Sequence, residues 1–222
     1  MSFLYQQQRV GINSPQRDMF AAAVILIALI VLATVLAKKE KKEKKKMGTK
    51  QLVFCAMAVA LAMVTSMLKV YSFPFGGSIT LFSMLFICFV GYVYGPATGI
   101  LTGAAYGVLQ FIIEPYIYFP LQVLVDYPLA FGALGLAGFF NKKKWGLQIG
   151  YVVGVFGRFI FSTISGIVFF ASYAPEGMNP ILYSLGYQAS YLVPEAVITL
   201  IIISIPPVAK ALARVKQNAV EA

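Results

Sequence analysis

The chain has 222 residues, of which 59% are hydrophobic, and its mean hydropathy is +0.80. This composition excludes an ordinary soluble domain, in which about half of the residues are apolar. Half of the net charge of +10 lies in one lysine run beside an apolar segment, which is typical of a membrane surface rather than of a nucleic-acid-binding protein. The absence of histidine removes the commonest metal ligand and general base.

Apolar runs of about 17–25 residues, each long enough to cross a bilayer as a helix, recur along the chain. The first, residues 19–37, precedes the lysine run "KKEKKEKKK". A signal peptide carries its basic residues before its apolar core, so this run predicts a retained anchor. Six more spans are predicted at residues 51–68, 79–94, 97–113, 121–140, 147–171 and 181–205.

These spans predict an all-α integral membrane protein with two parts. Residues 1–46 form a transmembrane anchor and a lysine-rich cytoplasmic linker, and residues 47–222 form a six-helix transmembrane bundle. With seven spans, the linker, the "NKKKW" loop at residues 141–145 and the basic C-terminal tail lie on one side. The excess of lysine and arginine makes this side cytoplasmic. The N-terminus is then outside and the C-terminus inside a bacterial cell membrane.

Three charged residues of the predicted bundle lie well inside its spans: Asp126, Arg158 and Glu195. Such groups are costly in a membrane and usually face a partner or a watery cavity. Arg158 and Glu195 are predicted at similar depth, where they either pair or form part of an ion pathway. Asp126 is predicted about 9 Å below the outer surface, at 1.5 Å per helical residue. Its partner is then a bound ligand, unless it caps backbone amides or pairs with Arg158.

Aromatic residues surround the predicted position of Asp126. They include Tyr116, Tyr118, Tyr127, Phe169, Phe170, Tyr173, Tyr183, Tyr187 and Tyr191. Single aromatic residues at this level are usually interfacial anchors. An acid within a cluster of rings, however, suits a flat cationic organic ligand, because the rings stack on it and the carboxylate neutralises it. The "SLGYQ" segment adds Ser184 and Gln188 as hydrogen-bonding groups.

Two patterns of small residues indicate close helix packing. Ala56 and Ala60 have a small-xxx-small spacing, which serves packing within the bundle or docking of a partner protein. The segment "GPATGILTGAAYG" at residues 95–107 is glycine-rich. It lacks the Gly-Lys-Ser/Thr ending of a phosphate-binding loop, so it is interpreted as a packing surface.

Four segments together resemble the thiamine-specific substrate-binding (S) components of energy-coupling factor (ECF) transporters. They are "GGSITLFSM", "VDYPLAFGALGLAGFF", "ISGIVFFASYAPEG" and "YSLGYQASYLVP". The resemblance covers about residues 50–210. It implies a six-helix bundle that captures thiamine at its outer face, a membrane scaffold protein, and two cytoplasmic ATPase subunits.

The resemblance also implies roles for individual residues. Asp126 matches the acidic position of the family, and Ala56 and Ala60 match residues that dock onto the scaffold. The other matching ligand-lining positions are Tyr116, Tyr127, Gly166, Phe170 and Tyr183. Ser162 stands where the family typically has histidine, and Gln188 where it has asparagine. These departures either preserve hydrogen bonds with altered reach or indicate a modified or precursor form of thiamine.

Three alternatives remain open beside a thiamine-binding subunit. One is the same transporter class with a different thiamine-related or other vitamin ligand. Another is a self-sufficient ion-coupled carrier that uses Arg158 and Glu195. An integral membrane enzyme is disfavoured, because no catalytic or metal-ligand constellation is present in the sequence. No cofactor, metal ion or nucleic-acid partner is expected.

Overall fold

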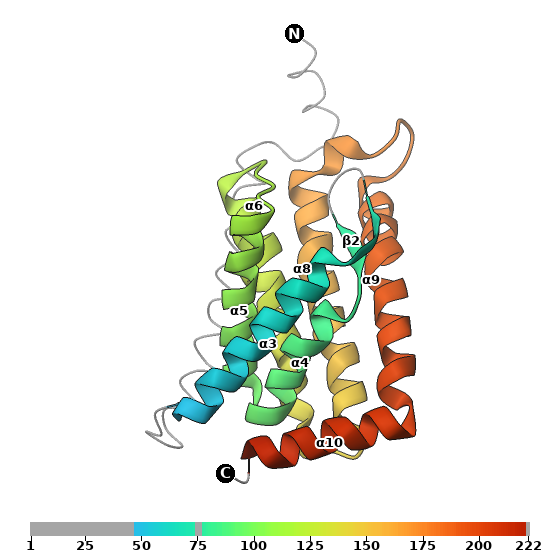
Figure 1. Cartoon of the computed structure of the whole chain (residues 1–222). Coiled ribbons are helices and arrows are strands. Elements are labelled where there is room, and N and C mark those ends of the chain that lie inside the picture. Colours follow the sequence, from blue (N-terminus) through green and yellow to red (C-terminus); the bar gives the residue numbers. More distant parts are fainter. Residues whose placement is uncertain (1–46, 74–76, 221–222) are drawn as a thin grey trace.

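The computed structural model describes residues 47–73 and 77–220. Five of its helical segments are long and apolar enough to cross a membrane: α3 (Thr49–Met67), α5 (Pro96–Ile113), the run Pro120–Phe140, α8 (Gly146–Phe169) and α9 (Pro180–Ser204). A sixth apolar helix, α4 (Ser83–Tyr94), is shorter. The predicted helical membrane fold is therefore confirmed for this part of the chain (Figure 1). The predicted anchor at 19–37 and the lysine run lie outside the described residues.

A short antiparallel hairpin replaces the start of the predicted span at 79–94. Strand β1 (Lys69–Ser72) pairs with β2 (Ser78–Thr80), with Tyr71 opposite Ile79. β-Branched and aromatic residues in these positions favour extended backbone. The hairpin lies beside the upper part of α9 (Figure 1), where the Phe73 ring packs 5.8 Å from that of Tyr187.

The run Pro120–Phe140 changes its helical type three times. It consists of α6 (Pro120–Leu124), a π-helical turn (Val125–Leu129), α7 (Ala130–Gly132) and a 3-10 helix (Ala133–Phe140). The π-helical turn contains Pro128, which has no N–H to donate to the ordinary α-helical pattern. Single π-helical turns of this kind are frequent at functional sites, and this one carries Asp126.

Glycines bring α5 into backbone contact with this irregular run. A Cβ atom added at Gly103 would lie 2.4 Å from the carbonyl oxygen of Phe131, and one at Gly107 would lie 2.4 Å from that of Tyr127. Side chains larger than hydrogen would separate the two segments. The packing role predicted for residues 95–107 is therefore confirmed, and it holds the segment around Asp126 against α5.

A helix that the sequence analysis treated as a tail closes the opposite end of the bundle. Helix α10 (Pro206–Val220) lies across the lower ends of the other helices (Figure 1). The Lys216 ammonium donates to the Asn141 carbonyl and lies 3.6 Å from the centre of the Tyr92 ring. The Tyr94 hydroxyl donates to the Ala219 carbonyl at 3.3 Å. These contacts hold α10 against α4 and place Lys216 beside the lysine-rich loop that follows the Pro120–Phe140 run.

Candidate functional site

The upper half of the bundle encloses a cavity of about 200 Å³. The hairpin, α3, α5, the Pro120–Phe140 run, α8 and α9 all contribute lining residues. The structure brings every residue predicted to bind substrate to this one cavity: Tyr116, Asp126, Tyr127, Ser162, Gly166, Phe170, Tyr183 and Gln188. Ala56 and Ala60 do not line it and are exposed on α3.

The Asp126 carboxylate is held by a neighbouring amide rather than by a basic side chain. Gln122 Nε2 donates to Asp126 Oδ2 at 2.6 Å. Among the described residues no ion pair joins Asp126 to Arg158. The Arg158 guanidinium lies over the Phe131 ring, 4.1 Å from its centre, and lines the same cavity. The cavity therefore presents a carboxylate whose charge is not neutralised by direct contact.

Tyr116, Phe170 and Tyr173 line one wall of the cavity, and Tyr118 packs with them in a cluster of tilted rings. The Phe170 ring lies 5.8 Å from Tyr116, 5.5 Å from Tyr118 and 5.7 Å from Tyr173, measured between ring centres. The hydroxyls of Tyr116 and Tyr173 are hydrogen-bonded at 3.3 Å. Burial, reinforced by the contact with Tyr173, raises the pKa of Tyr116, so this phenol stays uncharged at neutral pH. Such a wall is suited to stacking on a flat ligand.

Tyr183 and Tyr187 on α9 add a second aromatic pair, with ring centres 5.9 Å apart.

Tyr127, predicted to contact the ligand, lines the cavity, but its hydroxyl is bonded to the backbone of the protein. Its hydroxyl donates to the Glu114 carbonyl at 2.8 Å and accepts from the Tyr116 N–H at 3.1 Å. The hydroxyl thus fixes the segment after α5.

The two residues that depart from the family pattern lie against each other. Gln188 Nε2 donates to the backbone carbonyl of Ser162 at 3.1 Å, and its Oε1 accepts from the Tyr191 hydroxyl. A Cβ atom added at Gly166 would lie 2.1 Å from Ser184 Oγ. Gly166 therefore leaves the space in which Ser184 and Gln188 pack against α8.

The pairing considered for Arg158 and Glu195 is wrong. Glu195 is 3% exposed, and its carboxylate accepts from the Thr80 N–H at 3.1 Å, the Thr80 hydroxyl at 2.9 Å and the Ser83 hydroxyl at 3.3 Å. No ion pair with Arg158 occurs in the described part of the chain. Glu195 instead fixes β2 to α9, because hydroxyl and amide donors satisfy its charge.

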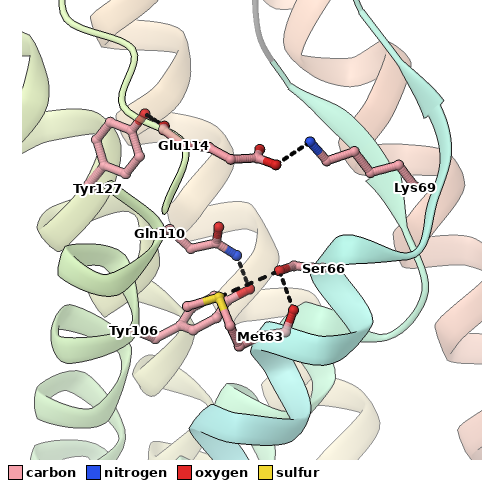
Figure 2. Close-up of polar contacts among 7 residues, drawn as sticks. All are labelled: Met63, Ser66, Lys69, Tyr106, Gln110, Glu114 and Tyr127. Atoms are coloured by element: carbon pink, nitrogen blue, oxygen red, sulfur yellow. Dashed lines mark hydrogen bonds and ion pairs between the residues drawn. The ribbon is translucent and has the colours of Figure 1, made fainter. Parts of the chain in front are cut away.

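Polar contacts also join the elements around the mouth of the cavity (Figure 2). Lys69 of β1 forms an ion pair with Glu114, which follows α5, and both side chains are partly exposed. Deeper in, the Tyr106 hydroxyl accepts from Gln110 Nε2 and donates to the Ala62 carbonyl. The hairpin and α3 are thereby connected to α5.

Gln122 is one of the lining residues that the sequence analysis did not name. It is 1% exposed and lies four residues before Asp126. Residues four apart share one face of a helix. An amide four residues before Asp126 in an apolar run therefore could have indicated that Gln122 contacts the carboxylate. In residues 47–73 and 77–220 no cluster of three potential metal ligands occurs.

The chain matches a family model described as thiamine transporter protein over residues 52–214. It is 35% identical over 165 residues to the thiamine transporter ThiT of Bacillus subtilis, a match covering 68% of this chain and 84% of that protein. It is 28% identical over 120 residues to ThiT of Lacticaseibacillus paracasei, covering 46% of this chain and 60% of that protein.

The fold agrees with that of a solved relative. The structure of ThiT from Listeria monocytogenes matches with a TM-score of 0.60 at 22% identity, covering 71% of this chain and 94% of that one. This likeness supports the multi-pass helical architecture. Because the family model spans well over half of the sequence, the chain belongs to the thiamine transporter protein family, whose members are membrane transporters and not enzymes.

Proposed function

We propose that this protein is the substrate-binding component of an ECF importer and captures thiamine at the outer face of the bacterial cell membrane. The observation that carries the proposal is the position of Asp126 in an aromatic-lined cavity. Thiamine contains a permanently cationic thiazolium ring. Aromatic faces attract such a cation by about 0.5–2 kcal/mol, and a partly desolvated carboxylate supplies its counter-charge. Family membership supports the same ligand.

The charge distribution supports an outward-facing cavity. Helix α10 and the loop at residues 141–145 carry exposed lysine and arginine side chains at the end of the bundle away from the hairpin. Basic residues concentrate on the cytoplasmic side of membrane proteins. The cavity lies near the other end, so in this orientation it opens outward and the C-terminus is cytoplasmic.

The purified chain is expected to bind thiamine without partner proteins. Trp145, the single tryptophan, is 59% exposed and immediately precedes α8 at the end far from the cavity. Binding should therefore release heat in a calorimeter while leaving tryptophan emission nearly unchanged. No detectable binding at thiamine concentrations up to about millimolar, equivalent to a binding free energy weaker than about 4 kcal/mol, would reject the proposed ligand.

Transport in this proposal depends on a scaffold protein and two ATPase subunits, because the sequence carries no Gly-Lys-Ser/Thr nucleotide motif of the kind that binds phosphates. We assign docking on the scaffold to Ala56 and Ala60. Both are exposed on α3 beside large apolar residues such as Met57, which is 60% exposed. Small residues allow another helix to approach closely in a membrane.

Ala60→Trp is expected to reduce thiamine uptake about tenfold or more in cells that contain the partner subunits, because loss of about 1.4 kcal/mol of docking energy is sufficient. Thiamine binding by the purified variant should be unchanged, since Ala60 does not line the cavity. Ala105→Trp, at an exposed alanine of α5, is the matched control and should transport normally. Wild-type uptake by the Ala60 variant would exclude this docking surface.

Ser162 and Gln188 are the reason to consider a second ligand, a modified or precursor form of thiamine, for the same class of transporter. Both residues line the cavity, where a serine hydroxyl and a glutamine amide are hydrogen-bonding groups different from the histidine and asparagine expected by resemblance. We propose to compare thiamine with its phosphorylated and precursor forms by calorimetry. Tighter binding of one of these forms would change the assigned ligand but not the class of transporter.

A self-sufficient ion-coupled carrier is less well supported. Its proposed ion pathway required Glu195, which already accepts hydrogen bonds from Thr80 and Ser83. Thiamine uptake by the chain alone in proteoliposomes, without ATP-hydrolysing partners, is the result that would favour the carrier.

A further inference from the structure

Gln122 uses both ends of its side-chain amide. Nε2 donates to Asp126 Oδ2 at 2.6 Å and to the Tyr116 carbonyl at 3.3 Å, while Oε1 accepts from the Tyr118 N–H at 3.1 Å. The amide orientation follows from its partners. A backbone N–H can only donate, and a carbonyl can only accept, so the NH₂ group must face the carboxylate.

This amide connects the charged group of the cavity to its aromatic wall. The residues that it binds through their backbone, Tyr116 and Tyr118, contribute rings that pack against Phe170. Gln122 is almost completely buried and lies on the same helical face as Asp126. One side chain therefore fixes the carboxylate relative to the rings that flank it.

We infer that Gln122 is a positioning residue for the cationic ligand, an inference that rests on the proposed function. By binding Oδ2, its amide fixes the rotamer of Asp126 and leaves Oδ1 for the cation. Hydrogen bonds to charged groups are stronger than those between neutral groups. The amide is itself held by the backbone of Tyr116 and Tyr118, so the cation meets a counter-charge that is already in place.

The test compares thiamine with a neutral thiophene analogue of thiamine by calorimetry. Gln122→Met keeps the length of the side chain and removes its hydrogen bonds. We expect thiamine affinity to fall about tenfold, as for loss of a charged hydrogen bond, and affinity for the neutral analogue to change less than about threefold. A purely structural role for Gln122 would weaken both ligands alike, and that result would overturn the inference, as would unchanged binding of thiamine.

Gln51→Met is the matched control. Gln51 donates a hydrogen bond to the Thr98 hydroxyl at 2.9 Å, outside the cavity, so its loss should alter neither affinity. If Gln122→Met does not unfold cooperatively on heating, Gln122→Asn replaces it, because the shorter amide cannot span the same partners, and the same criteria apply. Failure of the wild-type protein to bind thiamine is a separate result that overturns the proposed function itself.

Discussion

Asp126→Asn is expected to weaken thiamine binding at least about tenfold, because it removes the negative charge that faces the cation in a partly desolvated site. The side chain keeps its size, and the lining residues around it are unchanged. In the structure no ion pair within the described residues competes for this carboxylate, so its charge remains available to a ligand. Calorimetry on the purified variant measures the change directly.

Glu176→Gln provides the control for a general loss of negative charge. Glu176 is exposed in the segment between α8 and α9 and does not line the cavity. Its substitution should leave thiamine affinity within about twofold of wild type, since salt screens the interaction of an exposed charge outside the cavity with a ligand inside it. Equal affinities of wild type and Asp126→Asn would mean that Asp126 has a structural role only, and the proposed counter-charge would be wrong.

The position of Asp126 was predictable because the membrane restricts what an ionisable group can do. A carboxylate near the outer end of an apolar span needs a partner, and the surrounding tyrosines indicated what kind of ligand fits. The glycines at residues 95–107 were equally informative, since their spacing requires close packing. These signals are local in the sequence, and the structure confirms the cavity position and the packing.

The partner of Glu195 was not predictable in the same way. Thr80 and Ser83 lie more than one hundred residues away in the sequence, at separations of 115 and 112. The span predicted at 79–94 placed Thr80 inside a helix, whereas it ends β2. Hydrogen-bond donors at the end of β2 and the start of α4 satisfy the Glu195 carboxylate, for which the sequence analysis considered pairing with Arg158 or an ion pathway.

From the sequence, residues 206–220 are treated as a tail and not as a helix, because they do not form an apolar run long enough to cross a membrane. Helix α10 mixes apolar and basic side chains, and its first two residues are Pro206 and Pro207, which follow α9 after Ile205. Proline disfavours helical backbone in the residue before it, and Ile205 is extended. The sequence analysis assigned these charges to the cytoplasmic side, and the same residues form an ordered helix across the bundle.

The largest expected effect on stability comes from Gly135→Ala. A Cβ atom at this position would lie 2.1 Å from the Ile100 nitrogen and 2.2 Å from the Gly99 carbonyl carbon. Neither backbone atom can move without displacing α5 from the Pro120–Phe140 run. We expect the free energy of unfolding to fall by about 3 kcal/mol, the upper part of the range for overpacked cores, with a lower Tm of the purified protein in detergent.

Gly186→Ala is the matched control for this substitution. Gly186 lies inside α9 with no atom within 4 Å of an added Cβ, so alanine should stabilise the helix by about 0.5–1 kcal/mol. The two variants make the same chemical change and differ only in what the new methyl group contacts. If both have the wild-type Tm, the close approach of residues 99–100 to Gly135 does not exist in the folded protein. A lower Tm for Gly135→Ala alone would show that backbone contact between these segments holds the bundle, and with it the turn that carries Asp126.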